Sequence, residues 1–148
     1  MSDIKAPEIN ISFTERAKSV IERGSRGIVL LGVKDTFVMP MVNPITITSP
    51  GDIPSGIADV TKEQIKLALI GYQTTPIKVL VYGMGVDEEG TNADEAYTAA
   101  LKAWETIKFD YLAIPTVSTD GKAQEIAAWI KTMREKKKRI KAVLPHTP

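Results

Sequence analysis

The clearest pattern of hydrophobic and polar positions runs from Pro76 to Pro115. Lys78–Gly83 is a valine-rich apolar run with the length of a buried strand, and Tyr111–Ile114 is a second such run. Two strands joined through a helix must be parallel, so this stretch predicts a βαβ unit. Between the runs, one apolar stripe recurs at helical spacing: Ala93, Ala96, Tyr97, Ala100, Leu101, Trp104 and Ile107.

The same alternation continues toward the C-terminus. Thr119 or Asp120 is placed to cap a further helix, and Ile140–Leu144 is the next strand, so the second half predicts a right-handed β-α-β-α-β arrangement. The chain stops just past that strand. We expect the front part of a longer protein rather than a small domain that ends on an edge strand. The apolar stripe of the further helix is Ala123, Ile126, Ala127, Ile130 and Met133.

Upstream of the βαβ unit, Gly27–Gly32 is a buried-strand candidate. Phe37–Thr48 contains Pro40 and Pro44, so we expect its first half to be an edge or irregular and only Ile45–Thr48 to be a strand. Ser49–Gly56 has the composition of a turn.

A helix is predicted from Thr61, with Gln64 three positions later as in a capping box. Gly71 lies near its end, where a C-terminal glycine is expected. Asn92 and Glu95 form the same capping pattern at the start of the central helix. The apolar face of the first helix is Ile65, Ala68, Leu69 and Tyr72.

The first 24 residues are the least domain-like part of the chain. Glu8–Phe13 alternates polar and apolar residues, which is typical of a half-buried strand. Thr14–Arg23 is either a short helix, capped by Thr14, or part of an extended arm. A lone strand needs a sheet edge to pair with, in this molecule or in a neighbour.

These elements together predict an α/β fold. We expect a three-layer-like arrangement with a parallel or mixed sheet and βαβ units, preceded by an extended N-terminal arm. Residues 1–24 form the predicted arm, and residues 25–148 form the predicted core domain.

Composition excludes several classes of function but does not indicate a particular function. Apolar residues make up 43% and charged residues 25% of the 148, and the net charge is +1, so nothing indicates a nucleic-acid partner. The absence of cysteine excludes disulfides, thiolate catalysis and zinc–thiolate sites within these residues. No apolar run approaches the roughly 20 residues of a membrane helix, and the first ten residues do not resemble a secretory signal.

Candidate chemistry is expected at the carboxyl ends of the parallel strands, where open α/β sheets bind ligands. Gly83-Met84-Gly85 begins like a dinucleotide fingerprint, but Glu88 stands where the third glycine belongs, and the neighbouring acids would repel a phosphate. A cation site among Asp87, Glu88, Glu89 and Asp94 matches no calcium-loop spacing, so we interpret them as a solvated acidic loop.

A second loop offers hydroxyls before the last helix. Thr116, Ser118 and Thr119 could surround a phosphate, as in a small flavodoxin-like ligand-binding domain, although helix capping explains the same composition. His146 is the only histidine and lies in the terminal tail, so neither a multi-histidine metal site nor a Ser-His-Asp arrangement is predicted.

Two further features have structural interpretations. The basic run Lys136–Arg139 is expected to be a solvated helix end, with a partner-binding adaptor surface as the weaker alternative. Trp104 is expected in the core, and Trp129, beside the stripe of its helix, is a candidate interface residue. From chemistry alone, the sequence predicts a soluble α/β domain without a visible active site, and no cofactor or metal is assigned to it.

The N-terminal half carries a resemblance that the chemistry does not. In order, Ala6-Pro7, Ile9-Asn10-Ile11, the run Arg26–Gly32, Ile45–Ser49 and Lys78–Tyr82 resemble the opening of contractile tail sheath proteins of phages, defective prophages and phage-tail-like bacteriocins. The resemblance covers most of the chain. The proline-rich segment 37–44 departs from it, and sheath subunits are considerably longer, so the chain resembles an N-terminal portion.

The resemblance implies assembly rather than catalysis. Sheath subunits polymerise into a helical tube around an inner tube, and their terminal arms add strands to neighbouring subunits. It implies partners that are other sheath subunits and the inner tube protein, no nucleic acid and no membrane, and a place in a virion tail or phage-tail-like particle assembled in the host cytoplasm. Contraction would rearrange subunits as nearly rigid bodies. The residues expected in the inter-subunit arm are Ile9, Ile11 and Phe13.

Overall fold

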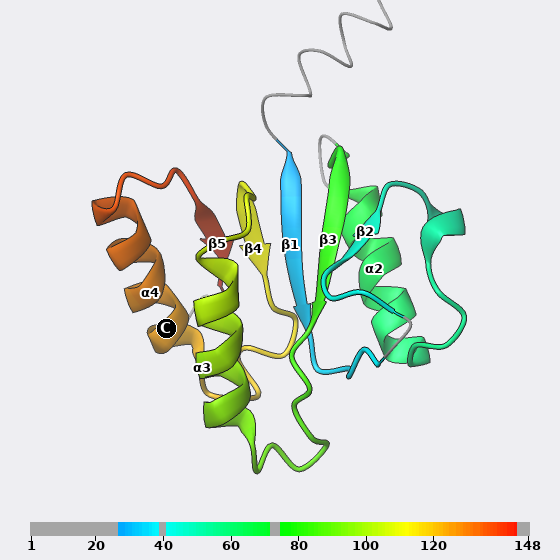
Figure 1. The fold of residues 1–148 in the computed structure, drawn as a ribbon, viewed down its shortest axis with the longest axis horizontal. Helices are drawn as coiled ribbons and strands as arrows, with labels where there is room; N and C mark the ends of the chain where they lie inside the picture. The colour runs from blue at the N-terminus through cyan, green and yellow to red at the C-terminus, as the bar shows by residue number, and fades with distance from the viewer. Residues whose placement is uncertain (1–26, 39–40, 72–74, 145–148) are drawn as a thin grey trace, which may run out of the picture.

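The structure is a computed structural model that describes residues 27–38, 41–71 and 75–144. Helices and strands alternate along it, as Figure 1 shows. The strands are β1 (Ile28–Val33), β2 (Ile45–Ile47), β3 (Lys78–Gly83), β4 (Tyr111–Ala113) and β5 (Lys141–Val143). The helices are α2 (Asp59–Ile70), α3 (Ala93–Trp104) and α4 (Ala123–Glu135), with a short 3-10 turn, η1 (Pro50–Asp52), after β2.

The described strands form one five-stranded mixed sheet in the order β2-β3-β1-β4-β5. β1 lies at its centre and pairs in parallel with both β3 and β4, and β5 adds in parallel to β4. β2 pairs antiparallel with β3 at one edge, where its proline-containing approach does not interrupt the sheet. The predicted α/β class is confirmed, and so is the parallel βαβ unit, although β1 lies between the two strands that α3 connects.

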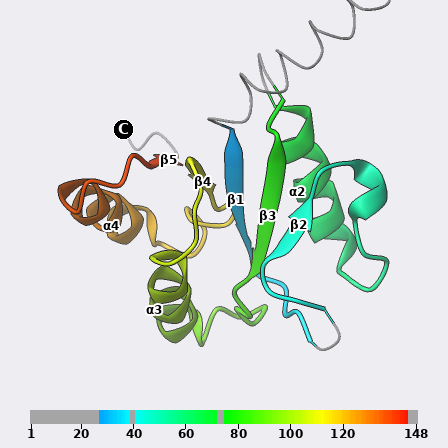
Figure 2. The same cartoon turned by 45° about the horizontal axis from the view of Figure 1, so that its top comes forward.

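The two faces of the sheet are covered by different helices, which gives three layers (Figures 1 and 2). Alternate residues of the central strands point to opposite faces. Leu30 and Leu80 join the cluster under α3 and α4, whereas Leu31, Val79 and Val81 join the cluster under α2. Burial on both faces explains why β1 and β3 are continuous apolar runs rather than alternating ones.

The predicted start of the first helix is wrong by two residues. α2 begins at Asp59, so Thr61 lies within its first turn, only 4% exposed, and does not cap it. The carboxylate of Asp35 accepts the Ala58 N–H at 2.9 Å and thereby supports the earlier start. Gly71 ends the helix with a φ of +67°, as its glycine predicts.

The predicted capping box at α3 is also not formed. Asn92 does occupy the position before Ala93, but its side chain makes no cap hydrogen bond. Instead its amide donates to the Gly85 carbonyl at 2.8 Å and accepts from the Asp87 N–H at 2.9 Å. The Asn92 side chain therefore bonds to the loop after β3 instead of capping the helix.

α4 starts at Ala123 after Lys122, so neither Thr119 nor Asp120 caps it. The helix ends in a Schellman motif: Lys137 has a φ of +65°, its N–H donates to Arg134, and the Lys138 N–H donates to Met133. The predicted buried stripes of α3 and α4 are otherwise confirmed, with Tyr97, Trp104, Ile126, Ile130 and Met133 buried.

Trp104 is at the centre of the core between α3 and the sheet. It is fully buried, and its ring lies edge-on to Tyr82 and Trp129, with centroids 5.6 and 6.3 Å away. A Cβ at Gly32 would lie 3.1 Å from the Trp104 ring, so the glycine leaves room for the indole against β1. Trp129 is half-buried against this cluster, so its ring helps to complete the core of the domain.

Candidate functional site

The predicted inter-subunit residues Ile9, Ile11 and Phe13 lie outside the described residues, as do Thr14–Arg23 and His146. The structure does show where the first described residue lies. Gly27 directly precedes β1, the central strand, at the edge of the sheet where the parallel strands begin. The root of the predicted arm is therefore expected at the middle of the sheet, not at an outer strand.

One carboxylate fixes this root. Asp110, the residue before β4, accepts the N–H groups of Gly27 and Ile28 through the same oxygen, at 2.8 and 2.9 Å. Its own N–H donates to the Ile28 carbonyl at 2.9 Å, and its carbonyl accepts from Lys141 at 3.0 Å. Asp110 thus connects the beginnings of β1, β4 and β5, and charge-assisted bonds of this kind are stronger than neutral ones.

At the opposite edge, the glycines at and just after the end of β3 have a packing role. A Cβ at Gly83 would lie 2.7 Å from the Asp35 carbonyl oxygen, which is too close for any other residue without a backbone shift. Gly85 has a φ of +70°, a conformation that favours glycine. Close approach of two loops, rather than a phosphate, accounts for the dinucleotide-like fragment.

A buried ionic contact links three elements at this carboxyl edge. Lys34, after β1, pairs with Asp120 at 2.9 Å, and the Tyr97 hydroxyl of α3 donates to the same carboxylate at 2.7 Å. Burial raises the pKa of Asp120, but the hydrogen bonds from Lys34 and Tyr97 outweigh it and hold that pKa below its usual value. Burial and the bond to Asp120 raise the pKa of Tyr97, which therefore stays protonated.

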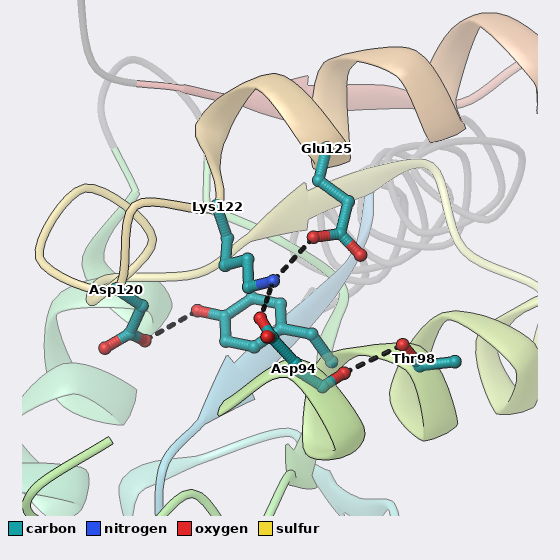
Figure 3. A network of polar contacts seen from close by, with 6 residues as sticks. Asp94, Thr98, Asp120, Lys122 and Glu125 are labelled. Carbon is teal, nitrogen blue, oxygen red and sulfur yellow. Dashed lines mark hydrogen bonds and ion pairs between the residues drawn. The ribbon is translucent and has the colours of Figure 1, made fainter. Parts of the chain in front are cut away.

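A second ionic contact joins α3 to α4, as Figure 3 shows. The Lys122 ammonium contacts the carboxylate of Asp94 and lies 2.8 Å from that of Glu125. The hydrogen bonds with Asp94 and Glu125 raise the pKa of Lys122, which is consequently fully charged. Asp94 is therefore engaged by a lysine, and Asp87, Glu88 and Glu89 remain as the acidic loop.

The loops at this edge surround an open cleft of about 420 Å³ between α2 and the β3–α3 loop. Its charged lining consists of Lys34, Asp35, Asp87 and Glu88, and its apolar lining includes Val86 and the exposed Val60. Thr116 also lines the cleft. Its hydroxyl is buried and has no hydrogen-bond partner among the described residues.

The structure disfavours the phosphate-binding hypothesis for the loop before α4. Its N–H groups are directed to carbonyls within the loop and not to an open space: Val117 donates to Ile114, Asp120 to Thr116, and Gly121 to Ser118. The Lys34 ammonium is paired with Asp120. An anion at Thr116, Ser118 and Thr119 would therefore meet a carboxylate and few free donors.

In the residues that the structure describes, no group of three or more histidine, cysteine or acidic side chains is arranged to hold a metal. Within the same ranges, no helix has the length and apolar character to cross a membrane.

Comparison with known proteins gives the decisive observation. No protein-family model matches the chain. Over 142 residues it is 33% identical to a tail sheath protein of Clostridium phage phiCD119, and the match covers 92% of this chain. This chain is a relative of that tail sheath protein. It spans 36% of the relative's length, so the predicted resemblance to a portion of a sheath protein is confirmed.

The contacts of two residues were not predicted from the sequence patterns. Lys34 and Asp110 each contact a strand or loop that lies far away in the chain. An acid directly before a strand, as at Asp110, is a signal only once β1 and β4 are known to be neighbours. The sequence does not contain that strand order explicitly.

We expect Asp120→Asn to lower the free energy of unfolding by about 1–2 kcal/mol at neutral pH, because Lys34 loses its buried counter-ion. The folded-state pKa of Asp120 is below its unfolded value, so this stabilisation is present above the unfolded pKa and disappears as pH falls through the folded pKa. Urea unfolding of both proteins from neutral to acidic pH should show the difference shrinking with acidification. A difference that grows in acid would contradict the assignment.

Proposed function

We propose that this chain is part of a structural subunit of a contractile tail sheath, which polymerises into a helical tube around an inner tube and contracts by rigid-body rearrangement. The observation that carries the proposal is the 33% identity to a phage tail sheath protein over 92% of the chain. Neighbouring sheath subunits and the inner tube protein are the proposed partners, and the virion tail is the proposed location. No catalytic step is part of this function.

The proposed division of labour follows the fold. Residues 25–148 are the α/β core domain, a body with two buried clusters that can move as a unit. Residues 1–24 are the arm that connects copies by adding a strand to a neighbour's sheet. A rigid core and a linking arm together suit a lattice that changes its geometry without dissolving.

The test is electron microscopy of the protein from the intact gene. We expect negatively stained preparations to contain regular hollow tubes, and we expect Ile9→Ser/Ile11→Ser/Phe13→Ser to abolish them. The reason is that the alternating apolar residues would form the buried face of an added strand. The melting temperature of the substituted protein should stay within a few degrees of the parent.

Leu67→Ser is the matched control, because Leu67 is 68% exposed on α2 and belongs to the core domain. Tubes that persist in the triple variant would refute the arm assignment. A parent protein that forms no tubes, even with co-expressed inner tube protein, would refute the sheath function itself.

A further inference from the structure

Charge is distributed unequally between the two ends of the domain. α2, α3 and α4 all begin at the carboxyl edge of the sheet and end at the amino edge, because each leads into or follows a parallel strand (Figure 1). We define the acidic end as Asp87, Glu88, Glu89 and Glu95, beside the cleft at the carboxyl edge. The basic end is Lys102, Lys108, Arg134, Lys136, Lys137 and Arg139, at the opposite edge.

Most of these charges are exposed, although Asp87 is half-buried and accepts from Thr91, and Arg134 donates to the Ile140 carbonyl. Glu88, Glu89, Lys137 and Arg139 are exposed, and none of them forms an ion pair within the part of the chain that the structure describes. Lys136 lies only 4.0 Å from Glu105, which is a weak surface contact. Both ends therefore present charge to a partner.

Helix dipoles do not explain the whole distribution. They favour acids in the first turn and bases in the last turn of a helix, and the effect fades beyond one turn. Glu88 and Glu89 precede the start of α3 at Ala93 by more than three residues, and Arg139 lies beyond the end of α4 at Glu135. α3 alone is about 18 Å long, so the two ends are separated by more than the Debye length of about 8 Å and do not neutralise one another.

The geometry points to a head-to-tail contact between two copies of this chain, in which the basic end of one copy docks on the acidic end and its cleft in the next. The cleft of about 420 Å³ gives the contact a hollow lined by Asp87 and Glu88 that can receive a lysine or arginine side chain, because Lys34, which also lines it, is already paired with Asp120. This inference rests on the proposed function, for which it names the contact surface of the core domain.

Such a contact is heterologous, so it does not close into a symmetric dimer and can continue from copy to copy. Exposed ion pairs contribute only about 0–1 kcal/mol each, so the contact alone is weak. In a lattice already linked by arms, the effective concentration of the partner surface is high, and a weak contact of this kind can fix the register of neighbouring copies.

The absence of cysteine in the chain allows a direct test. Glu89→Cys and Arg139→Cys variants of the chain are mixed at millimolar concentration and low ionic strength, and disulfide formation is followed under mild oxidation. The mixture should form about tenfold more cross-linked dimer than either variant alone, as expected for one to two kcal/mol of orientation preference. The excess should disappear in 0.5 M salt, where the Debye length falls to a few ångströms.

Charge reversal supplies the matched controls. Adding Glu88→Lys to the first variant should remove the excess, and adding Lys137→Glu to its partner should restore it. Lys66→Glu, which makes the same charge change as Lys137→Glu but at the middle of α2, should leave the excess unchanged. Equal yields in mixed and unmixed samples, or an excess that survives salt and reversal, would overturn the inference. Because this readout needs no tubes, its failure is distinct from a failure of the sheath proposal.

Discussion

Trp104→Ala is expected to lower the free energy of unfolding by about 3–5 kcal/mol, the usual cost of truncating a buried tryptophan. The side chain is fully buried. Its ring packs against Tyr82 and Trp129 and occupies the space beside Gly32. Its removal would leave a cavity between α3 and β1 that rigid neighbours cannot fill. Chemical denaturation should detect the change, as should a fall in melting temperature of about 10 °C.

Trp104→Phe keeps a ring in this space and removes the indole N–H, which is buried without a partner among the described residues. We therefore expect a clearly smaller loss than for alanine. Leu67→Ala, at a site 68% exposed, should change stability by no more than about 0.5 kcal/mol. A loss below about 1 kcal/mol for Trp104→Ala would show that the cluster under α3 does not hold the domain together.

The second large effect is expected at the root of the arm. Asp110→Ala removes the acceptor of two backbone N–H groups, Gly27 and Ile28, and should cost about 2–3 kcal/mol. Hydrogen exchange should localise the change: the amides of Gly27 and Ile28 should exchange much faster, while those at the centre of β3 keep most of their protection.

Asp110→Asn retains one carbonyl oxygen of similar geometry and should recover more than half of the lost stability. Asp59→Ala is the matched control, because that carboxylate is 95% exposed and pairs only with Lys62 at the surface. Unchanged exchange at Gly27 and Ile28 in Asp110→Ala would show that Asp110 does not hold the start of β1.

The elements of this fold could be predicted because their signals are local. The apolar runs at β1 and β3 and the stripe of α3 are periodic over six to twelve residues, and burial followed that periodicity. The capping residues could not be predicted in the same way. Asn92 and Asp120 are local candidates for a cap, but tertiary partners, the Gly85–Asp87 loop and Lys34, engage their side chains instead.

The candidate site was predictable only in part. The rule that loops gather at the carboxyl ends of parallel strands correctly brought the segments after β3 and β4 together. Strand order decided the rest: Lys34 meets Asp120 because β1 lies beside β4, and Asp110 meets Gly27 for the same reason. Local patterns do not specify which strands are neighbours, so these pairs needed the structure.

The central position of β1 has a mechanical consequence. A load applied through the residues before Gly27 acts along β1, which is held in parallel register by six residues of β3 on one side and three residues of β4 on the other. Both ladders are then loaded in shear, so many hydrogen bonds must fail together, whereas an edge strand could be peeled away one bond at a time. A pull applied at Gly27 would therefore load the centre of the sheet and not a strand that can be peeled from its edge.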